Sequence, residues 1–116
     1  GMHYQKDPHG EVKLVRCTKG AIFDVVIDVR LDSKTFKQWF CAELTADNHR
    51  ALYIPAGCAH GFLSLTDSCE VLYCIAGDYV PEASAGVRFD APAFGVQWPV
   101  APKVLSSRDA AYPDFV

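Results

Sequence analysis

A chain of 116 residues with a net charge of −3 at pH 7 is long enough to form one domain around its own hydrophobic core. Half of the residues are hydrophobic and 22% are charged, which excludes a disordered chain, and no basic stripe suggests binding to nucleic acid. The sequence contains no run of 18 apolar residues, so no membrane span is predicted. It also shows no charged-then-apolar leader before the first predicted strand.

The predicted elements are short strands. Residues 21–30, "AIFDVVIDVR", alternate with a period of two, which is typical of a half-buried strand. Aromatic and β-branched residues recur in shorter runs, and turns rich in Gly, Pro, Asn, Asp and Ser separate them. These runs cover residues 11–17, 37–44, 50–55, 61–65, 70–77 and 86–89. The pattern predicts an antiparallel sandwich or barrel.

The chain after Pro92 has a different character. It is rich in proline and small residues and cannot supply a central strand. We expect an extended C-terminal arm lying across the domain, with one short helical turn near "SSRDAAY". Because no repeat or composition shift divides the chain, residues 1–116 are predicted to be a single domain.

Five cysteines are scattered without a CxxC pair. An odd, dispersed set in a chain without a leader indicates reduced thiols that pack as small hydrophobic side chains, and therefore a cytoplasmic protein.

Two candidate functional residues lie near the start of the chain. His3, in "HYQ", is either a solvated terminal side chain or, together with the strand that holds Lys13, part of one cavity. The alternation places Lys13 on the same face as Val15 and Cys17. Its ammonium group then either faces an apolar interior, where it needs a partner or a ligand, or faces solvent on an edge strand.

Three further candidates lie on or beside later strands. His60 follows a Pro-Gly turn and either points into a barrel mouth or is a hydrogen-bonded core histidine. Tyr73 shares a strand face with Val71 and Ile75 and is either a core residue or a proton donor that faces a ligand. Tyr79, at a strand end, could stack on a planar ligand or simply pack against its neighbours.

Asp109 has two interpretations. With Ser106 three residues earlier it resembles a capping box at a helix start, and its carboxylate could instead orient a histidine. A metal site formed by His3, His9 and His60 is a competing possibility, and "PAGCAH" is reminiscent of metal-binding β-barrels. The HxH-plus-Glu set of those barrels is absent, so no metal is predicted.

Taken together, these segments resemble the dTDP-4-dehydrorhamnose 3,5-epimerase family, which has a cupin-type jelly roll. The matching stretches occur in family order and span essentially the whole chain: "MHYQ", "KLVRCTKGAIFDVVIDVRLDSKTF", "AELTADNHRALYIPAGCAHGF", "EVLYCI", "GVRFDAPAFGVQWP" and "LSSRDAAYP". The resemblance implies an all-β, antiparallel, cupin-like jelly-roll β-barrel with an extended C-terminal arm and a short helix.

The resemblance also implies roles for individual residues. His3 falls on the catalytic base, Asp109 on the carboxylate that pairs with it, and Tyr73 on the general acid. The implied substrate contacts are Lys13, His60, Tyr79 and Arg108.

Two residues depart from the family pattern. Ser84 stands where an acidic substrate contact is common, which puts a nucleotide or sugar contact in question. Cys74 replaces a usual lysine, a change expected to affect structure alone.

The implied reaction is epimerisation at C3 and C5 of dTDP-4-keto-6-deoxyglucose, without a cofactor or metal. The ketone acidifies both carbons, a neutral imidazole can remove a proton, and a cation such as Lys13 can stabilise the enolate. Tyr73 would return a proton from the opposite face. The alternatives are an inactive sugar-nucleotide-binding relative and a single-centre epimerase or ketoisomerase of deoxysugar biosynthesis.

The resemblance also implies an N-terminal portion and a second copy of the chain. In the family an Arg-Gly dipeptide and a substantial N-terminal portion precede "HYQ", so we expect a shortened relative or a chain begun at an internal methionine. A homodimer is also expected, because the remaining sheet would expose strand edges that need cover.

Overall fold

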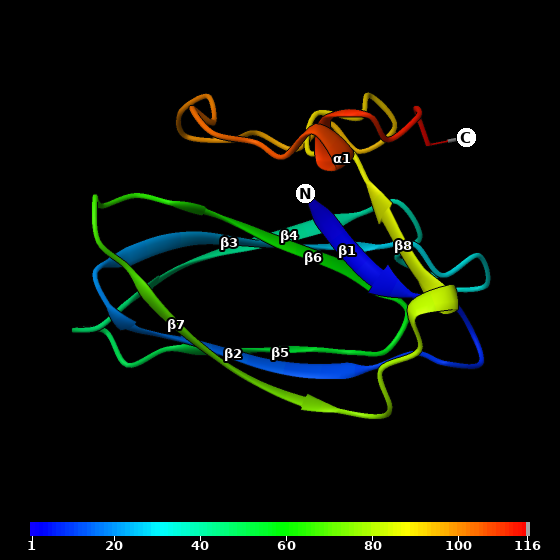
Figure 1. The fold of residues 1–116 in the computed structure, drawn as a ribbon, viewed down its shortest axis with the longest axis horizontal. Coiled ribbons are helices and arrows are strands. Elements are labelled where there is room, and N and C mark those ends of the chain that lie inside the picture. Colours follow the sequence, from blue (N-terminus) through cyan, green and yellow to red (C-terminus); the bar gives the residue numbers. More distant parts are fainter. Residues whose placement is uncertain (116) are drawn as a thin grey trace.

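Two antiparallel sheets face each other, and the C-terminal arm lies over the outer side of the larger sheet (Figure 1). The computed structural model describes residues 1–115. Within them the chain forms eight strands, one 3₁₀ turn and one short α-helix. Their bounds are β1 Met2–Gln5, β2 Val12–Lys19, β3 Ala21–Asp28, β4 Trp39–Thr45, β5 Ala51–Ile54, β6 Cys58–Ser64, β7 Glu70–Ala76, η1 Pro81–Ala83, β8 Ser84–Val87 and α1 Ser107–Ala110.

The strand order is that of a jelly roll. The larger sheet runs β4-β3-β6-β1-β8 and the smaller one β5-β2-β7, so strands far apart in sequence lie side by side. This confirms the predicted all-β antiparallel jelly roll, with its C-terminal arm and short helix. The two sheets pack as a sandwich and are not joined edge to edge into one closed barrel.

The structure contains a strand, β1, that the sequence patterns did not predict. Its four residues, Met2–Gln5, alternate between apolar and polar side chains, but this signal is confined to one short run at the start of the chain. Its hydrogen-bonding partners are remote in sequence, because His3 lies opposite His60 on β6 and opposite Gly86 on β8. The sheet, rather than local propensity, therefore determines this strand.

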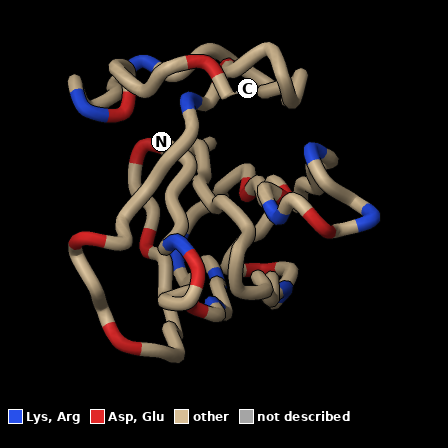
Figure 2. The backbone as a smooth tube through the Cα atoms, turned by 90° about the vertical axis from the view of Figure 1, so that its right-hand side faces the viewer, with Lys and Arg blue, Asp and Glu red and all other residues tan. Residues whose placement is uncertain are grey.

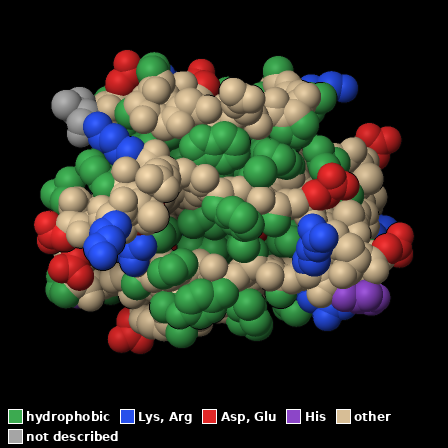
Figure 3. Space-filling view, turned by 180° about the vertical axis from the view of Figure 1, so that it is seen from behind, with side chains coloured by type: hydrophobic (Ala, Val, Ile, Leu, Met, Phe, Trp, Pro, Cys, Tyr) green, Lys and Arg blue, Asp and Glu red, His purple; other side chains and the backbone are tan. Residues whose placement is uncertain are grey.

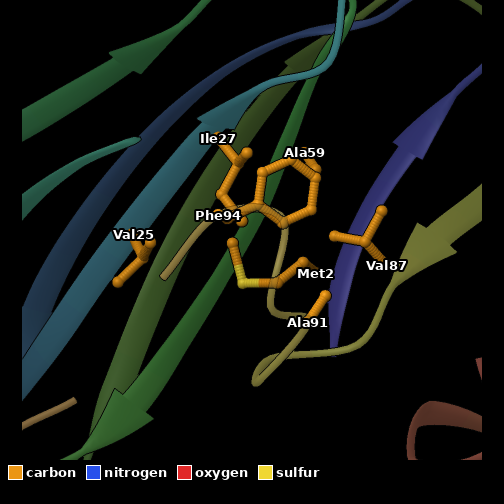
Figure 4. Close-up of a cluster of buried hydrophobic side chains, with 7 residues drawn as sticks. All are labelled: Met2, Val25, Ile27, Ala59, Val87, Ala91 and Phe94. Atoms are coloured by element: carbon orange, nitrogen blue, oxygen red, sulfur yellow. The ribbon is translucent and has the colours of Figure 1, made fainter. Parts of the chain in front are cut away.

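Strand β3 is buried on both faces, so the prediction of a half-buried strand is wrong. Val25 and Ile27 pack into an outer cluster beneath the arm, which Figure 4 shows around Met2 and Phe94. Ile22 packs into an inner cluster between the two sheets. The C-terminal arm covers the outer face of β3. The alternation within one strand cannot predict this packing, because the arm lies far along the chain.

Several contacts anchor the arm to the sheet. The Arg88 guanidinium donates to the carbonyl oxygen of Tyr112 at 3.1 Å and to the Asp114 carboxylate at 2.6 Å. The Tyr112 ring rests on Gly86, where an added Cβ would lie 2.4 Å from the ring. Because no side chain could occupy that position without displacing the ring, a glycine allows the arm to approach β8 closely.

Basic and acidic residues are interspersed along the described part of the backbone (Figure 2). Hydrophobic side chains gather across the back of the molecule (Figure 3). None of the helices in the described part of the chain has the length and apolar character needed to traverse a bilayer.

Candidate active site

The first and last parts of the chain meet in a histidine–carboxylate pair. His3 Nε2, on β1, lies 2.7 Å from Asp109 Oδ1, on α1, although the two residues are 106 positions apart. The Asp109 side chain is 13% exposed and the His3 side chain 40%. One partner is thus firmly held, and the other is open to a cavity.

The helix cap and the histidine contact coexist at Asp109. Its backbone N–H donates to the Ser106 side chain at 3.1 Å, which caps the helix, and this leaves the carboxylate free to face His3. Burial alone would raise the pKa of Asp109. Hydrogen bonds from His3 and Ser106 and the nearby amino group of Gly1 lower that pKa to about 2. Asp109 is therefore ionised at neutral pH.

This charge determines the proton arrangement on the His3 ring. An ionised carboxylate only accepts hydrogen bonds, so Nε2 of His3 is the nitrogen that donates. Nδ1 then keeps its lone pair in the neutral ring and is available to accept a proton. Asp109 would also stabilise the imidazolium that such a transfer creates.

His3 borders an inner cavity of about 420 Å³, which is large enough for one sugar ring. The side chains and backbone that line it are those of Gly1, His3, Lys13, His60, Gly61, Phe62 and Tyr73. The predicted base, acid and two of the substrate contacts thus surround the same space.

Lys13 faces this interior, which resolves the two alternatives for its orientation. It is 7% exposed, on the β2 face that also buries Val15 and Cys17. Its Nζ lies 3.6 Å from a carboxylate oxygen of Glu11, which partly balances the charge. The cavity therefore contains a nearly buried ammonium group.

His60 belongs to a second histidine–carboxylate pair. Its Nε2 lies 2.5 Å from Asp24 Oδ1, and both side chains are almost fully buried. Asp24 is absent from the predicted site residues, because alternation along residues 21–30 groups it with Asp28 and Arg30 on the more polar face of the strand. That face also holds Ile22 and Val26, and this was the available signal that the face is internal.

Tyr73 is positioned as a protonated phenol. Its ring lies 6.0 Å from the His60 ring, centre to centre, and the side chain is partly open to the cavity. Burial raises the pKa of Tyr73 to about 12, and the negative charge of Asp24 adds to the effect. The hydroxyl proton is therefore present throughout the neutral range.

An outer cavity of about 320 Å³ adjoins the inner one at His3. Tyr79, which is 75% exposed, borders it together with Arg108 and Ser84. An aromatic face and a guanidinium at one mouth can accept a planar base and a phosphate. The predicted contacts Tyr79 and Arg108 thus border the outer cavity, and His3 borders both cavities.

The described residues contain no group of three or more His, Cys, Asp or Glu side chains arranged to hold a metal ion. His9, the third histidine of the competing metal interpretation, lies exposed on the loop after β1. All five cysteines are free, and two of them, Cys17 and Cys58, are buried.

Comparison with known proteins identifies the relatives of this chain. A family model described as dTDP-4-dehydrorhamnose 3,5-epimerase matches residues 1–116. The enzyme of that name from Sinorhizobium fredii is 43% identical over 116 residues, which are 99% of this chain and 60% of the relative. The chain thus spans about three fifths of the length of that curated relative.

Solved structures agree with the sequence match. A Legionella pneumophila dTDP-6-deoxy-D-glucose-3,5-epimerase in complex with dTDP-4-keto-L-rhamnose superposes with a TM-score of 0.91 at 37% identity, covering 97% of this chain and 60% of that one. A 3'-monoepimerase from Streptomyces bikiniensis in complex with dTDP-quinovose gives 0.90 at 38% identity, covering 97% and 58%. The protein is therefore a member of the dTDP-4-dehydrorhamnose 3,5-epimerase family.

Proposed function

We propose that the protein is an isomerase that epimerises C3 and C5 of dTDP-4-keto-6-deoxyglucose to give dTDP-4-keto-L-rhamnose. The main support is the His3–Asp109 pair, which borders the same sugar-sized cavity as Tyr73 and Lys13. The names of the relatives and the dTDP-sugars in their structures suggest the substrate class.

The proposed reaction begins with proton abstraction. Nδ1 of His3 takes a proton from the carbon beside the C4 ketone, the C–H electron pair forms the enolate, and the negative charge moves to the C4 oxygen. Asp109 stabilises the resulting imidazolium, since its carboxylate is ionised and 2.7 Å from Nε2.

The enolate oxygen needs donors in the same cavity. The ammonium group of Lys13 is nearly buried and would be an effective partner, because electrostatic interactions strengthen where water is excluded. His60 lines the same cavity, and Asp24 fixes the orientation of its ring.

Inversion requires a proton from the other face of the ring. Tyr73 supplies it through its O–H, and the carbon regains its fourth bond with the opposite configuration. The phenolate then takes a proton from solvent and the imidazolium releases one, so both groups return to their starting states for the second centre. A pKa of about 12 keeps Tyr73 in the donor form between turnovers.

A monoepimerase is the second candidate, because the Streptomyces bikiniensis 3'-monoepimerase is 38% identical to this chain. Incubation of the protein with dTDP-4-keto-6-deoxyglucose in deuterated buffer separates the two candidates. Label at C3 and C5 supports the proposal, and label at one carbon supports the monoepimerase. Label at neither carbon indicates a binding protein without this activity.

We further propose that two copies of the chain associate. Leu14 on β2 and Tyr53 on β5 lie opposite each other in register and are 44% and 62% exposed, and Leu72 on β7 is 53% exposed. Large hydrophobic side chains exposed on neighbouring strands are typical of an interface. Light scattering after size exclusion should give twice the mass of one chain, and the mass of one chain would contradict the dimer.

A further inference from the structure

Gln5 is a buried polar side chain to which the proposed reaction gives no role. It is 3% exposed at the end of β1. Its Nε2 donates to the carbonyl oxygens of His9 at 2.7 Å and Asp78 at 3.1 Å, and its Oε1 accepts from the backbone N–H of Val80 at 2.9 Å. Both amide hydrogens and the amide oxygen are thus used, and the opposite amide orientation would lose all three bonds.

Two of these bonds hold the residues on either side of Tyr79. Asp78 and Val80 belong to the loop between β7 and η1, and Tyr79 between them is 75% exposed. An exposed ring on a loop loses conformational freedom when a ligand stacks on it. The hydrogen bonds between Gln5 and the backbone of Asp78 and Val80 restrict the loop backbone before the ligand binds, and they therefore reduce the conformational entropy lost on binding.

Gln5 and His3 share one face of β1, because side chains two positions apart on a strand point the same way. The strand pairs with β6 on one side and β8 on the other, so its backbone is held firmly. One short strand therefore sets both the place of the proposed base and the place of the loop that holds Tyr79.

We propose that Gln5 is a positioning residue that fixes Tyr79 at the mouth of the outer cavity, as a platform on which the base of the nucleotide stacks. This inference rests on the proposed function. Gln5 acts through the Tyr79 loop and determines affinity at the nucleotide end, while the groups around the sugar keep their geometry.

The test measures binding of dTDP to the full protein by calorimetry, with Gln5→Met, Tyr79→Ala and the double variant. Methionine has a similar size and removes all three hydrogen bonds. Each single variant should weaken dTDP binding about tenfold, and the double variant should bind no more weakly than Tyr79→Ala, because residues that act as one unit are not additive. Gln5→Met should raise KM about tenfold and leave kcat within about threefold.

A matched control is Gln38→Met, which removes an exposed glutamine away from both cavities and should leave dTDP affinity unchanged. Gln5→Glu is a second variant that retains the acceptor for Val80 and loses both donors. It should also weaken dTDP binding, so the proposal stays testable if Gln5→Met does not fold.

Three results would overturn the inference. The first is unchanged dTDP affinity in folded Gln5 variants, and the second is unchanged affinity in Tyr79→Ala. The third is a double variant whose loss equals the product of the two single losses, since Gln5 would then act independently of Tyr79. Deuterium exchange by the wild-type protein reports separately on the proposed function, and wild-type protein that does not bind dTDP overturns both.

Discussion

Replacement of Asp109 by asparagine tests the histidine–carboxylate pair. The substitution keeps the size of the side chain and removes its charge. The amide can still accept a hydrogen bond from Nε2 of His3, but it no longer offers a negative charge to the imidazolium. The ring also loses the preference for Nε2–H that the acceptor-only carboxylate enforces.

The magnitude follows from the geometry of the pair. A hydrogen bond to a charged group contributes about 1.5–3 kcal/mol. The His3 side chain is 40% exposed, so solvent screening places this bond near the lower end of that range. About 1.5–2 kcal/mol corresponds to a loss of roughly 10- to 30-fold in rate. The loss should fall on kcat, since the imidazolium forms only as the proton moves.

The assay is the initial rate of deuterium incorporation at C3 and C5 of dTDP-4-keto-6-deoxyglucose, with KM measured in parallel. Asp67→Asn is the matched control, because it neutralises a carboxylate in the exposed turn between β6 and β7. The control should retain the wild-type rate. A rate for Asp109→Asn within threefold of wild type would refute the role of the carboxylate.

Three further results are expected. In Asp24→Asn the pKa of Tyr73 should fall from about 12, because the negative charge that adds to the effect of burial is lost. Difference absorbance titration with Tyr73→Phe as reference measures this pKa, and an unchanged value contradicts the electrostatic effect of Asp24. Gly86→Ala puts a Cβ 2.4 Å from the Tyr112 ring and should lower the melting temperature by about 4 °C or more, since overpacking costs about 1–3 kcal/mol; an unchanged temperature refutes the close approach. The pKa of Asp109 is lowered on folding from 3.8 to about 2, so its stabilising contribution is complete above pH 3.8 and is lost as pH falls toward 2. Urea unfolding at pH 5 and pH 3 should therefore show wild type losing stability relative to Asp109→Asn, and a constant difference between the two would contradict the shift.

Much of the fold could be predicted because the strands alternate. The run at residues 21–30 contains β3, and the proline-rich composition after Pro92 indicates the arm. The burial of both faces of β3 could not be predicted, since it depends on the arm packing over one face from far along the chain. Strand β1 was missed because its alternation spans only four residues, and the strands that pair with it are remote in sequence.

The candidate site could be predicted only through the resemblance to a family. Alternation placed Lys13 with Val15 and Cys17 but could not choose between interior and solvent, and this choice depends on the opposing sheet. The one local signal that separates Asp24 from a solvent-facing carboxylate is the pair of apolar residues on the same strand face, Ile22 and Val26. The meeting of Asp24 with His60 requires β3 and β6 to lie side by side in the sheet.

The most direct measurement is solvent-deuterium exchange by His3→Asn, followed at C3 and C5 of dTDP-4-keto-6-deoxyglucose by NMR. Asparagine removes the imidazole that is 2.7 Å from Asp109 and that borders the cavity with Tyr73. The wild-type protein should incorporate deuterium at both carbons, and the variant at neither. Incorporation by the variant at the wild-type rate would show that His3 is not the base.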